Sequence, residues 1–176
     1  MISVECNKKI IPILKSNLEN NISNYIIIEN GCGSKTSIGE VIMPDYSTDN
    51  IGMAQIKIVR KKSDVSVNIK TLDSIIETIN EDYKNIGMIK IDVEGMELDV
   101  LKGAKEILLK QRPHLFIEAK NNLEFQKIYN YLIKFKYIPM SVWAKTPVYH
   151  FVYKPSLILK IYLKYLTMNT KNEIQL

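Results

Sequence analysis

Three acidic side chains follow two segments that the sequence predicts to be neighbouring β-strands. Asp92 and Glu94 come directly after the β-branched run Met88–Ile91, and Glu118 closes the apolar segment His114–Glu118. The carboxyl ends of parallel strands face the ligand site in α/β proteins, so we expect the three carboxylates at one edge of a sheet. A carboxylate there can remove the proton from a substrate hydroxyl group. Two acids could also hold a divalent cation through oxygen, but the sequence fixes no third ligand, so no metal is predicted.

The segment between those two strands has the pattern of a helix. Its apolar residues recur on one helical face and are Val100, Leu101, Ala104, Ile107 and Leu108. A strand–helix–strand unit of this length implies parallel strands joined by a right-handed crossover. Gly103 lies inside the helical pattern, where glycine costs about 1 kcal/mol relative to alanine. It therefore predicts either close packing or a break between two shorter helices.

The N-terminal residues repeat the same order of elements. A short strand, Met1–Val4, ends at Glu5, and a helix with Pro12 in its first turn follows. A second strand, Tyr25–Ile28, precedes Glu29-Asn30. A carboxylate at a strand end can accept two hydrogen bonds from the hydroxyl groups of a ribose. On spacing alone, a solvated turn residue is the preferred interpretation of Glu5, because acids at strand ends are common.

The middle of the chain is predicted to contain further strands and a helix. The extended segments Met53–Val59 and Val65–Ile69 flank the basic run Arg60-Lys61-Lys62. That run is predicted to be a hairpin turn and not a phosphate site. Thr71 is the expected N-cap of a helix that continues through about Ile79.

The C-terminal part predicts a helix, a hairpin and a tail. Leu123–Phe135 is amphipathic, and the short connection between the strands Tyr137–Trp143 and Val148–Tyr153 makes them antiparallel. Residues 1–154 are therefore expected to form one domain. The basic amphipathic tail, Pro155–Leu176, could pack on this domain, join a partner subunit in a homodimer, or lie on a membrane surface. Packing on the domain or on a partner is the preferred interpretation.

The composition is that of an ordinary globular protein. The chain has 176 residues, 46% of them hydrophobic and 24% charged, with a net charge of +5, which suits one domain with a substantial core. No basic motif with interleaved aromatic residues is present, so nucleic-acid binding is not expected. Cys6 and Cys32 form no CxxC pair, and two histidines are too few for a Cys/His zinc site. Free thiols and the lack of a signal-peptide pattern favour a cytoplasmic location.

The segment Ile89–Ala104, IKIDVEGMELDVLKGA, resembles the signature of the FkbM-type methyltransferases, which use S-adenosylmethionine. The downstream RPHLFIEA is similar to that family's next strand, and the upstream VECNKKIIPILKSNLENN is similar to the segment that follows its second strand. The resemblance implies an α/β fold with a Rossmann-like class I methyltransferase sheet, mostly parallel, that ends in an antiparallel hairpin. It also implies transfer of the sulfonium methyl group, commonly to a hydroxyl group of a sugar or natural product.

The resemblance further implies roles for individual residues. The predicted cofactor-binding residues, which would contact the ribose, the adenine and the methyl group of S-adenosylmethionine, are Glu5, Glu29, Asn30 and Asp92. The predicted catalytic residues, which would face the methyl group and the acceptor, are Asp92, Glu94 and Glu118. Asp92 or Glu94 is the candidate base.

One feature of the family pattern is absent. In the family, a strand and a glycine-rich turn precede the acidic position by some tens of residues, whereas this chain begins almost at Glu5. The sheet is therefore expected to be N-terminally truncated, without the strand that separates those ending at Glu5 and Asp92. Two functions stay open. One is a methyltransferase acting on a small-molecule or glycan acceptor. The other is a catalytically inactive remnant that serves as an interaction module, its sheet completed by a partner strand or a dimer.

Overall fold

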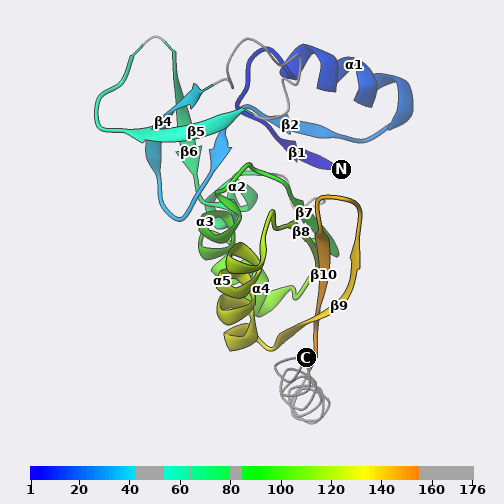
Figure 1. Cartoon of the computed structure of the whole chain (residues 1–176). Coiled ribbons are helices and arrows are strands. Elements are labelled where there is room, and N and C mark those ends of the chain that lie inside the picture. Colours follow the sequence, from blue (N-terminus) through cyan, green and yellow to red (C-terminus); the bar gives the residue numbers. More distant parts are fainter. Residues whose placement is uncertain (43–53, 64, 80–84, 155–176) are drawn as a thin grey trace. The chain divides into compact units, whose positions relative to one another are not determined.

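The computed structural model divides the chain into two compact units. The first, called here the N-terminal unit, comprises residues 1–86 and 91–111, and the second, the C-terminal unit, comprises residues 87–90 and 112–176. The structure describes residues 1–42, 54–63, 65–79 and 85–154, and Figure 1 shows their elements in chain order. The tail Pro155–Leu176 and the first residue of the predicted strand Met53–Val59 lie outside these ranges.

The N-terminal unit begins with the predicted strand–helix–strand segment. Strand β1 (Ile2–Val4), helix α1 (Ile11–Asn21) and strand β2 (Ile26–Ile28) follow one another, and β1 pairs with β2 in parallel. Pro12 lies in the first turn of α1. An N–H group at that position has no partner within the helix, so proline loses no helical hydrogen bond there. Leu18 is the buried residue of this helix. The sequence-based prediction for this segment is confirmed.

A second sheet of the N-terminal unit contains β3 (Gly31–Cys32), β4 (Ser37–Ile42), β5 (Gln55–Val59) and β6 (Ser66–Lys70). Its strand order is β3-β6-β4-β5, with β4 antiparallel to both β5 and β6 and with β3 parallel to β6. The predicted hairpin between β5 and β6 is therefore wrong.

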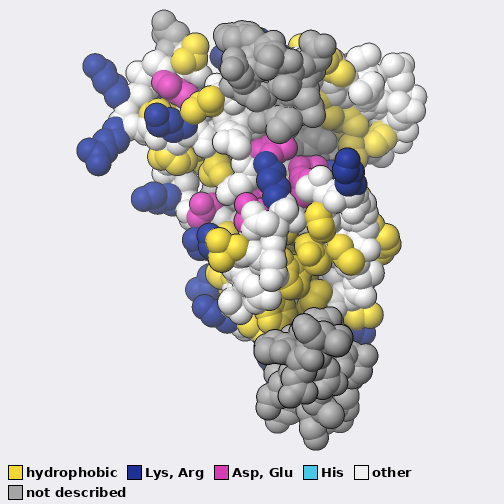
Figure 2. Space-filling view, viewed as in Figure 1, with side chains coloured by type: hydrophobic (Ala, Val, Ile, Leu, Met, Phe, Trp, Pro, Cys, Tyr) yellow, Lys and Arg dark blue, Asp and Glu magenta, His cyan; other side chains and the backbone are white. Residues whose placement is uncertain are grey.

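The physical reason for this error lies in the burial of the strands. Strand β6 carries the buried Val67 and Ile69 and takes an inner position, whereas β5 exposes Lys57 and Ile58 and takes the edge. The basic residues 60–62 are exposed on the connection that crosses the end of β4. Figure 2 shows lysine and arginine side chains projecting outward from this part of the unit.

Three short helices complete the N-terminal unit, namely α2 (Leu72–Glu77), α3 (Glu97–Lys102) and α4 (Lys105–Lys110). Thr71 caps α2 as predicted, because its side chain accepts a hydrogen bond from the N–H of Ser74 at 3.1 Å. Asp73 in turn caps α4 across the unit: its carboxylate accepts hydrogen bonds from the N–H groups of Glu106 and Ile107 at 2.9 and 3.1 Å.

Gly103 separates α3 from α4 and packs against backbone. A Cβ atom built on Gly103 would overlap the carbonyl oxygen of Gly33 and would lie 3.2 Å from the Cα atom of Thr71. The carbonyl group of Gly103 accepts a hydrogen bond from the N–H of Asp73 at 2.9 Å. Both predictions for this glycine, a helix break and close packing, are confirmed.

The described residues of the C-terminal unit form one sheet and one longer helix. The elements are β7 (Met88–Ile91), β8 (His114–Glu118), α5 (Asn122–Leu132) with a 3₁₀ turn (Ile133–Phe135), β9 (Tyr137–Trp143) and β10 (Val148–Tyr153). The strand order is β7-β8-β10-β9, and β10 is antiparallel to both β8 and β9. The predicted C-terminal hairpin is confirmed, and the fold as a whole is α/β with mixed sheets. The division between the units passes through β7.

Helix α5 covers one face of this sheet. The Phe125 ring of this helix packs against two rings of β10. Its centroid lies 4.3 Å from that of Tyr149 and 6.2 Å from that of Phe151. The core of the unit consists of side chains that are almost fully buried, namely Leu115, Ile117, Ile128, Leu132, Tyr137, Ile138 and Phe151. Among the described residues, no helix combines the length and the apolar character that crossing a membrane requires.

We predict that Gly103→Ala destabilises the protein by about 2 kcal/mol, because the added methyl group must displace the backbone of Gly33. Thermal and chemical denaturation followed by circular dichroism would measure this change. Gly87→Ala is the matched control, since a Cβ atom at Gly87 meets no atom within 4 Å. Equal stabilities of the two variants would contradict the close contact.

Candidate functional site

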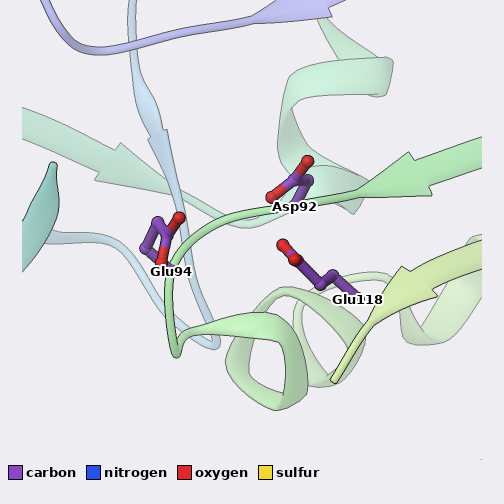
Figure 3. Close-up of side chains that lie close together, drawn as sticks. All are labelled: Asp92, Glu94 and Glu118. Atoms are coloured by element: carbon purple, nitrogen blue, oxygen red, sulfur yellow. The ribbon is translucent and has the colours of Figure 1, made fainter. Parts of the chain in front are cut away.

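The three acidic residues at the ends of β7 and β8 lie together. Asp92, Glu94 and Glu118 each place one carboxylate oxygen within 4.8 Å of the others. Figure 3 shows Asp92 and Glu118 reaching toward each other from their strand ends, with Glu94 on the turn that follows. Asp92 is exposed, and the other two are half-buried. The sequence-based expectation that these carboxylates share one edge is confirmed, whereas their catalytic roles stay predictions.

The direction of the two strands explains why the acids meet. The N–H of His114, at the start of β8, donates to the carbonyl oxygen of Gly87, just before β7, at 2.9 Å. The strands thus begin side by side, and they also end side by side, because carboxylate oxygens of Asp92 and Glu118 lie within 4.8 Å of each other. The two strands therefore run in the same direction, as the crossover pattern predicts.

The turn after β7 sets the position of Glu94. Glu94 and Gly95 both adopt positive φ angles, 53° and 101°. Gly95 donates its N–H to a carboxylate oxygen of Glu97 at 3.0 Å, and Glu97 is itself only 5% exposed. Glu97 therefore fixes the turn that leads into α3. The turn brings the side chain of Glu94 back toward Asp92.

Three carboxylates in this arrangement can perform two kinds of chemistry. They can accept hydrogen bonds and a proton from a bound hydroxyl group. They also form a group that could hold a metal ion, because hard cations prefer oxygen ligands. Glu118 supplies the third carboxylate oxygen of this group; sequence reasoning placed Glu118 at this edge but did not assign it as a metal ligand. Exposed acidic groups commonly occur without an ion, so the predicted absence of a metal stays a prediction.

Glu5 lies at the end of β1, as predicted, and outside the cluster of three carboxylates. Its N–H donates to the carbonyl oxygen of Ile28 at 3.0 Å, and its carboxylate oxygen Oε1 accepts from the N–H of Asn7 at 2.6 Å. Asn7 is 5% exposed, and its Oδ1 accepts from the N–H of Lys9 at 3.1 Å. The carboxylate of Glu5 therefore shapes the turn after β1.

A cavity of about 380 Å³ lies within the N-terminal unit, next to the end of β1. Glu29, Cys6, Lys8 and Lys62 belong to its lining. Asn30 follows Glu29 in a tight turn, in which its N–H donates to the carbonyl oxygen of Ile28 at 2.9 Å. Sequence reasoning missed the two lysines, because it assigned Lys62 to a hairpin turn and no spacing links Lys62 to Lys8.

The two cysteines are free, half-buried thiols. Burial, followed by the negative charge of Glu5, raises the pKa of Cys6 to about 11. Burial, with a smaller contribution from Cys6, raises the pKa of Cys32 to about 12. Both thiols are therefore protonated near neutral pH, and neither has the character of a nucleophile.

The chain is similar to known FkbM methyltransferases, both in sequence and in fold. The family model described as the methyltransferase FkbM domain matches residues 1–139. This chain belongs to the FkbM methyltransferase family. A search of curated proteins found no match.

The fold is similar to that of a solved structure. The crystal structure of methyltransferase FkbM from Methylobacillus flagellatus KT, at 2.20 Å resolution, matches with a TM-score of 0.60 and 18% sequence identity. The match covers 86% of this chain and 36% of that protein, so the chain spans about a third of its length. At this level of identity the match shows a shared fold.

We predict that Cys6 reacts about 200-fold more slowly with Ellman's reagent at pH 8 than free cysteine does, because a pKa of about 11 leaves little thiolate. The rate should rise as the pH approaches 11, and Cys32 should react more slowly still. Labelling in concentrated guanidinium chloride, where burial is lost, is the control. Rapid labelling of the folded protein at pH 8 would disprove the burial of the thiols.

Proposed function

We propose that this chain provides a Rossmann-like class I methyltransferase domain that transfers a methyl group from S-adenosylmethionine to a hydroxyl group of a small molecule or glycan. The observation that carries the proposal is the group formed by Asp92, Glu94 and Glu118 at the ends of β7 and β8 in a member of the FkbM family. In α/β folds, ligands bind beyond the carboxyl ends of parallel strands.

The N-terminal unit offers residues that suit the nucleoside part of the cofactor. Glu5 presents a half-buried carboxylate at the end of β1, and a carboxylate can accept hydrogen bonds from both ribose hydroxyl groups. The cavity beside it, lined by Cys6 and Glu29, has a volume within the range of small-molecule pockets. Asn30, next to Glu29, would lie beside the adenine. These features support cofactor binding in this unit.

The carboxylate group supplies the chemistry that a hydroxyl acceptor needs. When bound, S-adenosylmethionine offers an electrophilic methyl group on its sulfonium sulfur. Asp92 or Glu94 would accept the proton of the acceptor hydroxyl group, which makes its oxygen a better nucleophile toward the methyl group that S-adenosylmethionine would supply. Glu118 accepts a second hydrogen bond and orients the acceptor. Much of the rate acceleration then comes from holding the reacting groups in line.

One observation favours the second candidate function, a non-catalytic interaction module. Within the described residues, β1 pairs with β2 alone, and β7 pairs with β8 alone. Strands with one partner can accept a further strand from another chain. A module of this kind would use the sheet edges and would not bind the cofactor, so a binding measurement separates the two functions.

Calorimetric titration with S-adenosylmethionine tests the cofactor assignment. We predict saturable binding to the wild-type chain and an affinity about tenfold lower for Glu5→Gln, because the variant loses a charge-assisted hydrogen bond. Glutamine keeps an oxygen that can accept the N–H of Asn7, so the turn survives. Glu19→Gln, which removes an exposed partner of Lys15, is the control. Absence of heat with the wild-type chain would favour the interaction module.

Methyl transfer tests the catalytic assignment. With S-adenosylmethionine and a panel of methyl glycosides, we expect Asp92→Asn to form S-adenosylhomocysteine about 100-fold more slowly, because the base is lost. Asp99→Asn, which changes an exposed carboxylate paired with Lys102 on α3, is the matched control. Wild-type turnover by Asp92→Asn would exclude Asp92 as the base and leave Glu94.

A further inference from the structure

Four aromatic rings lie together on one face of the C-terminal sheet. We call this surface the ring face, and its residues are His114 and Phe116 of β8, Trp143 of β9 and His150 of β10. Side chains alternate between the two faces of a strand. Tyr149, the neighbour of His150 on β10, packs on Phe125 of α5. His150 therefore points away from α5, and the ring face is the side of the sheet that α5 does not cover.

Three of these rings form one continuous surface. The centroids of Phe116 and His150 lie 4.5 Å apart with 3° between the ring planes, and the register places these two residues opposite each other. The centroid of Trp143 lies 5.8 Å from that of His150 and 5.9 Å from that of Phe116. Burial, with a smaller contribution from His114, lowers the pKa of His150, so its ring is neutral near pH 7. The surface is therefore uncharged and mainly apolar.

The direction of the strands places Trp143 and Glu118 at the same edge of the sheet. Strand β10 is antiparallel to both β8 and β9, so β8 and β9 run in the same direction. Glu118 is the last residue of β8 and Trp143 is the last residue of β9, and both pair with Val148. Residues that pair across strands share a face. The ring face therefore begins beside Glu118, a member of the group of three carboxylates.

The ring face and Glu118 together define the chemistry of a ligand. Trp143 is 49% exposed and Phe116 is half-buried, and aromatic faces of this kind favour a ligand with an apolar side. The carboxylate beside them requires a hydrogen-bond donor, because covering a charge without one is costly. A pyranose offers both, since C–H groups cover the faces of its ring and hydroxyl groups surround its rim.

The spacing of the strands agrees with a ligand of this size. Two strand spacings, roughly 10 Å in total, separate Glu118 from Trp143. A hexopyranose with its hydroxyl groups is almost as wide. A sugar that lies over Val148, between the two residues, can therefore reach the indole ring on one side and the carboxylate on the other.

We propose that the ring face is the acceptor-binding surface of this domain and that its acceptor is a pyranose. One face of the sugar ring stacks on Trp143 and Phe116, and a hydroxyl group at the rim donates a hydrogen bond to the carboxylate of Glu118. This inference rests on the proposed methyl transfer to a hydroxyl group, and it names the class of acceptor and two residues that bind it.

Fluorescence of Trp143, the single tryptophan of the chain, tests sugar binding without the cofactor. We titrate the full chain with the methyl pyranosides of glucose, galactose, mannose and rhamnose. We expect a saturable shift of the emission to shorter wavelength and an acrylamide quenching constant about twofold lower, because the sugar covers the indole ring. Cyclohexanol, a ring with one hydroxyl group, and sorbitol, a polyol without a ring, are the control ligands. If no pyranoside gives a saturable change, or if the controls give the same change, the proposal is overturned.

Variants test the two contacts separately. Glu118→Gln keeps the fluorescent reporter, and we expect about tenfold weaker pyranoside binding, because a charge-assisted hydrogen bond is lost. Trp143→Ala should raise the KM for the pyranoside about tenfold and leave the affinity for S-adenosylmethionine unchanged, whereas Trp143→Phe, which keeps an aromatic ring, should restore most of the loss. Val142→Ala is the matched control, since Val142 is 53% exposed and adjoins Trp143 on the opposite face of β9.

The outcomes distinguish this inference from the proposed function. If the wild-type chain turns over a pyranoside and Trp143→Ala leaves the KM unchanged, methyl transfer stands and the ring face is excluded as the acceptor-binding surface. If Glu118→Gln binds the pyranoside as the wild-type chain does, the placement of the hydroxyl group is overturned. If the wild-type chain binds a pyranoside and forms no S-adenosylhomocysteine, the sugar site stands and methyl transfer fails. Far-UV circular dichroism of each variant identifies any loss of folding.

Discussion

The pairing of β7 with β8 is the interaction on which the candidate site depends. Glu118 is the last residue of β8, and Asp92 follows the last residue of β7, so the register of these two strands decides whether their carboxylates meet. A slip of one residue would turn Glu118 to the other face of the sheet. The neighbours Ile117 and Ala119 are both buried, and their burial fixes the register that places Glu118 with the other acids.

Local patterns in the sequence predicted the elements well and their partners less well. The β-branched runs, the cap at Thr71 and the break at Gly103 depend on neighbouring residues, and each is found in the structure. The partner of β6 depends on the burial of Val67 and Ile69, which no local pattern encodes, and the predicted hairpin was wrong. For the same reason, no local pattern predicted that Lys8 and Lys62 line one cavity.

The candidate site could be predicted to a similar extent. Strand alternation and the crossover rule located Asp92 and Glu118, because parallel strands must end at one edge. The position of Glu94 depends on the geometry of the turn after β7. Gly95 predicts a turn there, but it does not predict where the side chain of Glu94 lies. The roles of Glu5, Glu29 and Asn30 rest on resemblance to a family, and their positions at strand ends are compatible with those roles.

The backbone of Glu94 carries a further implication. Its φ angle of 53° lies in the left-handed region, where a residue with a side chain is disfavoured by about 1 kcal/mol or more relative to glycine. Glycine at position 94 would remove this cost. The side chain that is present there instead places a third carboxylate with those of Asp92 and Glu118.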